Sequence, residues 1–253
     1  MNENIKLEFR GVEKSFGDNH VLRGVDLRIP EGEITVIIGQ SGEGKSVLLK
    51  HIIRLLSPDQ GQVLFDGTDI APLRSVELGK LRAKFGMLFQ GGALFDSLTV
   101  GENVSFPLRE HTRLSPREIS EKVREKLHLV GLDGIEDRMP SQLSGGMQKR
   151  VGLARAIVRE PEVLLYDEPT TGLDPILSDS IDRLIVQMEE SLNITSVIIS
   201  HDMRRAMGFA HSVAMLHAGK IFAHASPKEF SSADNPVIRQ FLAGSSEGSI
   251  EVL

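Results

Sequence analysis

The feature that most constrains the fold is an eight-residue stretch, Gly39 to Ser46, that fits the pattern G-x-x-x-x-G-K-[ST]. In this pattern the N–H groups of a glycine-rich loop surround phosphate groups. The apolar run Ile34–Ile38 predicts a buried strand that enters the loop, and residues 46–56 predict a helix that leaves it. The sequence therefore predicts an α/β fold that binds a nucleoside triphosphate, although kinases, GTPases and motors share this loop.

Individual residues of the loop have distinct expected roles. Lys45 places a positive charge at the β- and γ-phosphates, and Ser46 offers an oxygen to Mg²⁺. Glu43 occupies a free position of the pattern, and we expect its acidic side chain to face away from the phosphates. The residues expected to contact the nucleotide here are Gly39, Ser41, Gly42, Glu43, Gly44, Lys45, Ser46 and Val47.

Composition limits the other classes of function. The net charge of −6 gives no general electrostatic reason to bind nucleic acid. Cysteine is absent, which excludes disulfides, cysteine-ligated zinc and thiol catalysis. The start of the chain lacks a signal peptide, and no apolar run approaches the ~20 residues needed to cross a bilayer. We therefore expect a cytoplasmic chain whose membrane work needs partner subunits.

The chain has two kinds of segment. Alternation around residues 5–9 and 25–29 predicts antiparallel strands, and the runs Val163–Tyr166 and Ile194–Ile199 predict buried parallel strands. Residues 97–160 predict a helical insertion, in which Ser115 starts a capping box. The expected organisation is one domain over 1–243 and a flexible Gly- and Ser-rich tail over 244–253.

Leu143-Ser144-Gly145-Gly146-Met147-Gln148 resembles the signature of ABC-type ATPases, and Asp167-Glu168 after its apolar strand resembles their Walker B motif. The resemblance implies a P-loop NTPase (RecA-like) α/β core with an N-terminal antiparallel β-subdomain and an inserted α-helical subdomain. It also implies hydrolysis of ATP with Mg²⁺. Asp167 would hold the metal, and Glu168 would orient or deprotonate the attacking water.

The same resemblance gives roles to further residues. His201 matches the switch histidine that reaches the γ-phosphate, so the implied catalytic residues are Lys45, Glu168 and His201. Gln90 matches a metal-contacting glutamine, which joins Ser46 and Asp167 at the metal, and Phe16 matches a ring that stacks on adenine. Ser144, Gly145 and Gly146 would meet the ATP held by a second copy of the chain. Two copies would then close face to face around two ATP molecules.

Subfamily features indicate the cargo. Segments 46–53, 92–98, 139–150 and 235–244 are similar to the Mla/Mce-type lipid-trafficking ATPases. That similarity implies a permease, an MCE-type lipid-binding subunit, an accessory subunit, and attachment to the cytoplasmic face of the inner membrane. The implied cargo is phospholipid moved between the inner and outer membranes, which maintains lipid asymmetry of the outer membrane.

Three alternatives stay open at this point. The ATPase could serve a soluble assembly scaffold, a cell-division complex that acts on a cell-wall hydrolase, or an importer of another small solute. The apolar face of Val237, Ile238, Phe241 and Leu242 could dock on a second copy, on an accessory subunit, or on its own domain.

Overall fold

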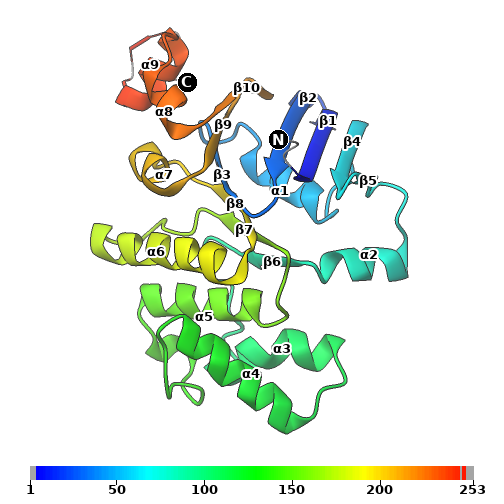
Figure 1. Ribbon diagram of the computed structural model, residues 1–253, viewed down its shortest axis with the longest axis vertical. Helices are drawn as coiled ribbons and strands as arrows, with labels where there is room; N and C mark the ends of the chain where they lie inside the picture. The colour runs from blue at the N-terminus through cyan, green and yellow to red at the C-terminus, as the bar shows by residue number, and fades with distance from the viewer. Residues whose placement is uncertain (1–3, 246, 249–253) are drawn as a thin grey trace. The chain divides into compact units, whose positions relative to one another are not determined.

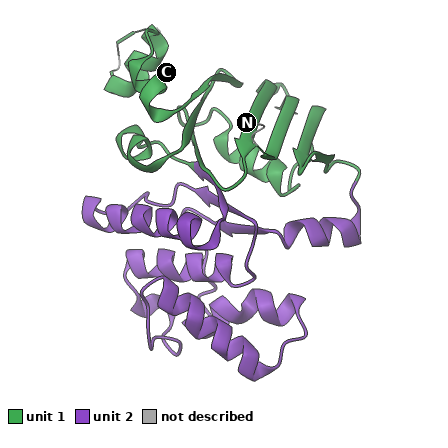
Figure 2. Cartoon of the chain, viewed as in Figure 1, with its two compact units in different colours: residues 1–72, 199–253 green, residues 73–198 purple. Residues whose placement is uncertain are grey.

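A computed structural model of the chain describes residues 4–245 and 247–248 (Figure 1). The chain divides into two compact units, residues 1–72 with 199–253 and residues 73–198 (Figure 2). The prediction of one ATPase domain over 1–243 with a helical insertion over 97–160 follows other boundaries and stays a prediction. Of the predicted flexible tail, residues 246 and 249–253 lie outside the described residues.

Unit 1 contains an antiparallel sheet and part of a parallel one. The antiparallel sheet has the strand order β2-β1-β4-β5. In the same unit, β9 pairs with β3 in a parallel arrangement and with β10 in an antiparallel one. The elements of this unit are β1 Ile5–Phe16, β2 Asn19–Pro30, β3 Ile34–Ile38, α1 Lys45–Ile52, β4 Gln60–Phe65, β5 Thr68–Asp69, α7 Met203–Phe209, β9 Ser212–His217, β10 Lys220–Ala225, α8 Pro227–Ser232 and α9 Pro236–Ala243.

The two predicted antiparallel strands and the strand before the phosphate loop are confirmed. β1 pairs with β2 through a register that includes Leu7 opposite Ile29. All five residues of β3 are buried, as an apolar run between neighbouring strands requires. Helix α1 ends at Ile52, earlier than the predicted Leu56, because Arg54 adopts a left-handed backbone (φ 51°) that turns the chain.

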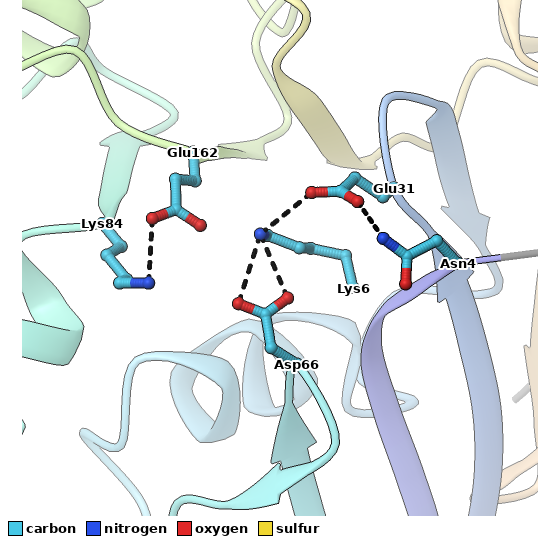
Figure 3. A network of polar contacts seen from close by, with 6 residues as sticks. All are labelled: Asn4, Lys6, Glu31, Asp66, Lys84 and Glu162. Carbon is cyan, nitrogen blue, oxygen red and sulfur yellow. Dashed lines mark hydrogen bonds and ion pairs between the residues drawn. The ribbon is translucent and has the colours of Figure 1, made fainter.

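A buried ammonium group ties the first strand to two turns of unit 1. Lys6 on β1 is 5% exposed, and its Nζ lies 3.2 Å from Glu31 Oε1 and 3.1 Å from Asp66 Oδ1 (Figure 3). Asn4 donates a further hydrogen bond to Glu31. The pairing offsets the cost of burying the charge, since an unpaired buried cation is strongly unfavourable.

Unit 2 contains parallel strands and the helices α2 to α6. Its strand order is β8-β7-β6, and β6 pairs with β7 in parallel. Helices α3, α4 and α5 pack on one another, and α5 also packs on α6 (Figure 1). The elements are α2 Ser75–Arg82, β6 Phe85–Leu88, α3 Val100–His111, α4 Pro116–Leu129, a 3₁₀ turn Pro140–Gln142, α5 Gly145–Ile157, β7 Val163–Asp167, α6 Pro175–Leu192 and β8 Thr195–Ile199, which ends at the unit boundary.

Capping residues decide where these helices begin. Ser115 accepts from the Glu118 N–H while Glu118 accepts from the Ser115 N–H, which confirms the predicted capping box. Asn235 caps α9 without such a box, since its side-chain oxygen accepts from the Val237 N–H. Among the described residues, no helix combines the length and apolar character that crossing a membrane requires.

Candidate nucleotide-binding and hydrolysis site

The phosphate loop, residues 39–46, joins β3 to α1 through glycines whose backbone other residues would strain. Gly39 has φ +155°, and a Cβ there would lie 2.4 Å from the Leu216 carbonyl oxygen. Gly44, the N-cap of α1, has φ +100°, and a Cβ there would lie 2.6 Å from Val21 Cγ1. At these two positions the loop lies closer to its neighbours than a residue with a Cβ could. The N–H groups of the loop are therefore not crowded by Cβ atoms.

Lys45 is held by the first residues of the loop. Its Nζ donates to the carbonyl oxygens of Gly39 at 2.9 Å and Gln40 at 2.6 Å, and the residue is 6% exposed. Ser46 and Val47 follow it in the first turn of α1 and are half-buried, whereas Ser41 is exposed. A cation fixed beside the N-terminus of a helix favours an anionic ligand there.

Glu43, the acidic residue of the loop, points its carboxylate at the hairpin between β9 and β10. The Nδ1 atom of His217 lies 2.8 Å from Glu43 Oε1. The N–H groups of Ala218 and Gln40 also donate to this carboxylate, at 3.3 and 3.2 Å. Sequence reasoning left its partner open, and the outward orientation in the presence of a nucleotide stays a prediction.

The other predicted residues of unit 1 lie at the ends of elements. Phe16 ends β1, is 47% exposed, and has the Lys14 ammonium 5.6 Å from its ring centroid. His201 follows β8 and is exposed, next to Asp202, which caps α7. His201 and Gln40 line a cavity of about 510 Å³ together with Phe241 and Leu242 of α9. No pattern in the sequence predicts that α9 lies beside His201.

In unit 2 the carboxylate segment, Asp167–Thr171, begins at the last residue of the buried strand β7. Asp167 ends the strand and is half-buried, and Glu168 comes just beyond it with a left-handed backbone (φ 49°). The Glu168 carboxylate accepts from Thr171 Oγ1 at 2.9 Å and from Gln90 Nε2 at 3.4 Å. The structure thus brings together Gln90 and Glu168, which sequence reasoning named separately, and adds Thr171, which it gave no catalytic role.

A buried lysine also holds the carboxylate segment. Lys149 on α5 is 5% exposed, and its Nζ donates to the carbonyl oxygens of Pro169 and Thr171, both at 2.7 Å. Burial lowers the pKa of Lys149, and the nearby charge of Glu168 acts in the opposite direction. Lys149 lies between the apolar residues Met147 and Val151 in the sequence, so its burial could not be read from the apolar pattern.

The signature residues start α5. Ser144 is its N-cap and accepts from the Met147 N–H at 3.3 Å. Ser144 and Gly145 are exposed, whereas Gly146 is buried, and a Cβ on it would lie 3.3 Å from Leu177. The buried face of α5 carries Val151, Ala154 and Ile157.

The comparisons with known proteins place these features in one family. The family model described as "ABC transporter" matches residues 22–171. The chain belongs to the ABC transporter family. This confirms the resemblance and the expected fold, and it makes the chain an ATP-hydrolysing, nucleotide-binding cassette of a transporter.

Two curated relatives and one solved structure are similar over most of this ABC cassette. A "probable ribonucleotide transport ATP-binding protein mkl" of Mycobacterium leprae is 43% identical over 97% of this chain and 71% of its own length. The "intermembrane phospholipid transport system ATP-binding protein MlaF" of Haemophilus influenzae is 41% identical over 99% of this chain and 94% of its own length. The ATP-binding cassette MJ0796, solved as a dimer bound to ADP and Pi, is 34% identical with a TM-score of 0.79, covering 87% of this chain and 98% of that one.

Proposed function

We propose that this ABC cassette hydrolyses ATP to move phospholipid, or a similar hydrophobic molecule, between two membranes. The observation that carries the cargo is the alignment with MlaF, which spans both chains almost from end to end. The mkl relatives are slightly more identical but extend well beyond the part that this chain matches. Residues 46–53, 92–98 and 139–150, on which the lipid-trafficking resemblance rests, lie within the aligned region.

The proposed chemistry assigns one task to each polar group. Glu168 orients or deprotonates the water that attacks the γ-phosphate, and its bonds to Gln90 and Thr171 fix the direction of its carboxylate. Lys45 neutralises charge at the phosphates, as does the N-terminus of α1. His201 contacts the γ-phosphate, and Phe16 stacks on adenine.

The metal in this proposal is Mg²⁺. Ser46, Gln90 and Asp167 would hold it through a hydroxyl, an amide oxygen and a carboxylate, which are the hard oxygen donors that Mg²⁺ prefers. Among the described residues, no cluster of three or more His, Cys, Asp or Glu side chains could hold a metal ion. A site with one carboxylate fits a cation that is shared with nucleotide phosphates, where it would neutralise developing negative charge.

Two copies of the chain form the working unit in this proposal. The exposed signature residues Ser144 and Gly145 would contact the ATP held by the phosphate loop of the second copy. The dimeric state of the solved cassette MJ0796 supports this arrangement. ATP then stabilises the closed pair, and hydrolysis separates it.

An apolar surface in unit 2 suits the permease. Phe89, Phe95 and Phe106 are 42%, 44% and 38% exposed and line a groove of about 350 Å³ that also contains Arg155 and Arg159. Exposed aromatic rings with arginines at their edge are typical of protein interfaces. We propose that a membrane-embedded permease docks here and holds the ATPase at the cytoplasmic face of the inner membrane. An MCE-type lipid-binding subunit and an accessory subunit complete the complex.

Ribonucleotide transport is a second candidate, and the name of the mkl relatives favours it. The experiment that separates the two is to purify the chain with its native membrane partners and identify bound molecules by mass spectrometry. We expect phospholipids in the wild-type complex. Recovery of ribonucleotides other than ATP and ADP, which the cassette itself binds, without enrichment of lipids over a detergent blank contradicts the lipid assignment.

Stimulation of ATP hydrolysis gives an independent measurement. In proteoliposomes the complete complex should hydrolyse ATP faster when phospholipid acceptor vesicles are present, and an added ribonucleoside monophosphate should have no such effect. The same complex with Glu168→Gln serves as the matched control for contaminating ATPases.

A further inference from the structure

The phosphate loop carries a negative side chain that the proposed function does not use. Glu43 lies between Gly42 and Gly44, in the segment expected to surround phosphate groups. A carboxylate free to turn toward a triphosphate would repel it, because like charges at short range are unfavourable. Its side chain is only 14% exposed, so its direction is set by the groups that it contacts.

Three donors hold this carboxylate. His217 Nδ1 lies 2.8 Å from Oε1, and because a carboxylate carries no proton, the imidazole is the donor. The Ala218 N–H donates to the same oxygen, and the Gln40 N–H donates to Oε2. Among these three, only the His217 donor belongs to a side chain, so it is the one that a substitution can remove.

The position of His217 is itself fixed. It ends β9, and its ring meets Phe222 of β10 edge to face, with centroids 5.9 Å apart at 87°. The turn that follows is anchored to β2, because the Arg23 N–H donates to the Gly219 carbonyl oxygen at 2.8 Å. The imidazole therefore comes from a rigid hairpin rather than from a mobile loop.

We propose that His217 is a positioning residue that holds the Glu43 carboxylate against the β9–β10 turn and keeps its charge away from the nucleotide phosphates. The inference rests on the phosphate-binding role proposed above for residues 39–46. A purely structural pair would predict something different, since removing either partner would then lower the melting temperature and leave the affinity for nucleotide unchanged.

The test uses four full-length chains: wild type, His217→Ala, Glu43→Gln, and the double variant. Affinity for a fluorescent ATP analogue with Mg²⁺ is measured for each, together with the melting temperature. His217→Ala should weaken binding by about tenfold, the size of effect that one unscreened charge gives near a surface. In the Glu43→Gln background the same change should alter affinity less than twofold, because the side chain at position 43 then carries no negative charge that could turn toward the phosphates.

Two controls keep the outcome readable. His217→Asn retains an N–H donor near the position of Nδ1 and should recover most of the lost affinity. The defect of His217→Ala should shrink at high salt, because screening weakens charge repulsion. A double variant as weak as His217→Ala, or His217→Ala with wild-type affinity, overturns the proposal.

Lys45→Ala separates a failure of this inference from a failure of the proposed site. If Lys45→Ala loses affinity while His217→Ala does not, the loop binds phosphate and the role of His217 is wrong. If Lys45→Ala binds the analogue as wild type does, the phosphate site itself is misassigned and the inference falls with it.

Discussion

The phosphate loop and the carboxylate segment are both short turns that follow a buried parallel strand, yet they keep their shapes by different means. The shape of the loop depends on its own backbone conformation, since Gly39 and Gly44 take positive φ values and leave no space for a Cβ. The carboxylate segment is instead held in place by a side chain from another element, since Lys149 on α5 donates to the carbonyl oxygens of Pro169 and Thr171.

This difference suits the two tasks. A loop that surrounds phosphates needs many N–H groups in one fixed arrangement, and glycines provide it locally. A base must keep one carboxylate aimed at a water molecule, and supporting contacts from outside the segment can adjust its aim. We therefore expect substitutions in the loop to affect binding first, and substitutions around Glu168 to affect turnover first.

The largest expected effect sharpens this contrast at the base itself. Glu168→Gln should retain ATP binding and lower kcat by about a hundredfold or more, the usual contribution of a general base. It should also leave a closed, ATP-bound dimer that gel filtration can detect. Wild-type turnover in this variant would remove Glu168 from the role of base.

Two alanine substitutions test whether the loop depends on its backbone. Gly39→Ala places a Cβ 2.4 Å from a carbonyl oxygen, whereas Gly42→Ala, at φ +85°, meets nothing within 4 Å. Gly42→Ala should cost about 1–2 kcal/mol from left-handed strain alone. Gly39→Ala adds overpacking of about 1–3 kcal/mol, so its ATP affinity and melting temperature should be clearly lower. Equal effects at both positions would break the comparison.

Lys149→Met tests whether the carboxylate segment depends on its outside support. The change leaves two carbonyl groups without their charged donor, which should cost about 1.5–3 kcal/mol of stability. We expect kcat to fall while KM for ATP stays close to wild type, with Lys149→Arg recovering part of the loss. A higher KM at unchanged kcat would show that the segment serves binding rather than turnover.

The smallest effect concerns the helix that follows the loop. His51 on α1 is buried with Nδ1 2.7 Å from the Val47 carbonyl oxygen, and burial lowers its pKa from the ordinary 6.5. The unfolded chain therefore takes up this proton at a higher pH than the folded chain, so stability should fall as the pH drops below about 6.5. The measurement is the melting temperature of wild type and of His51→Gln between pH 7.5 and 5.5. The melting temperature of the variant should fall less steeply as the pH is lowered.

Much of the site could be predicted because its signals are local. The glycine spacing of residues 39–46, the apolar run before Asp167 and the serine caps each report on a few neighbouring residues, and the structure has the expected strand or helix at each place. The length of the helix after the loop was predicted wrongly. The left-handed backbone of Arg54 stops this helix, and the pattern of apolar residues does not show it.

The sequence by itself determined the family, the loop and the order of the elements, because hydrophobic period and motif spacing are properties of a continuous chain. Only the tertiary structure decided that His217 meets Glu43 and that Lys149 supports the segment carrying Glu168. These partners stand far apart in the chain, and the pairing of distant residues depends on how strands and helices are brought side by side, which no local pattern encodes.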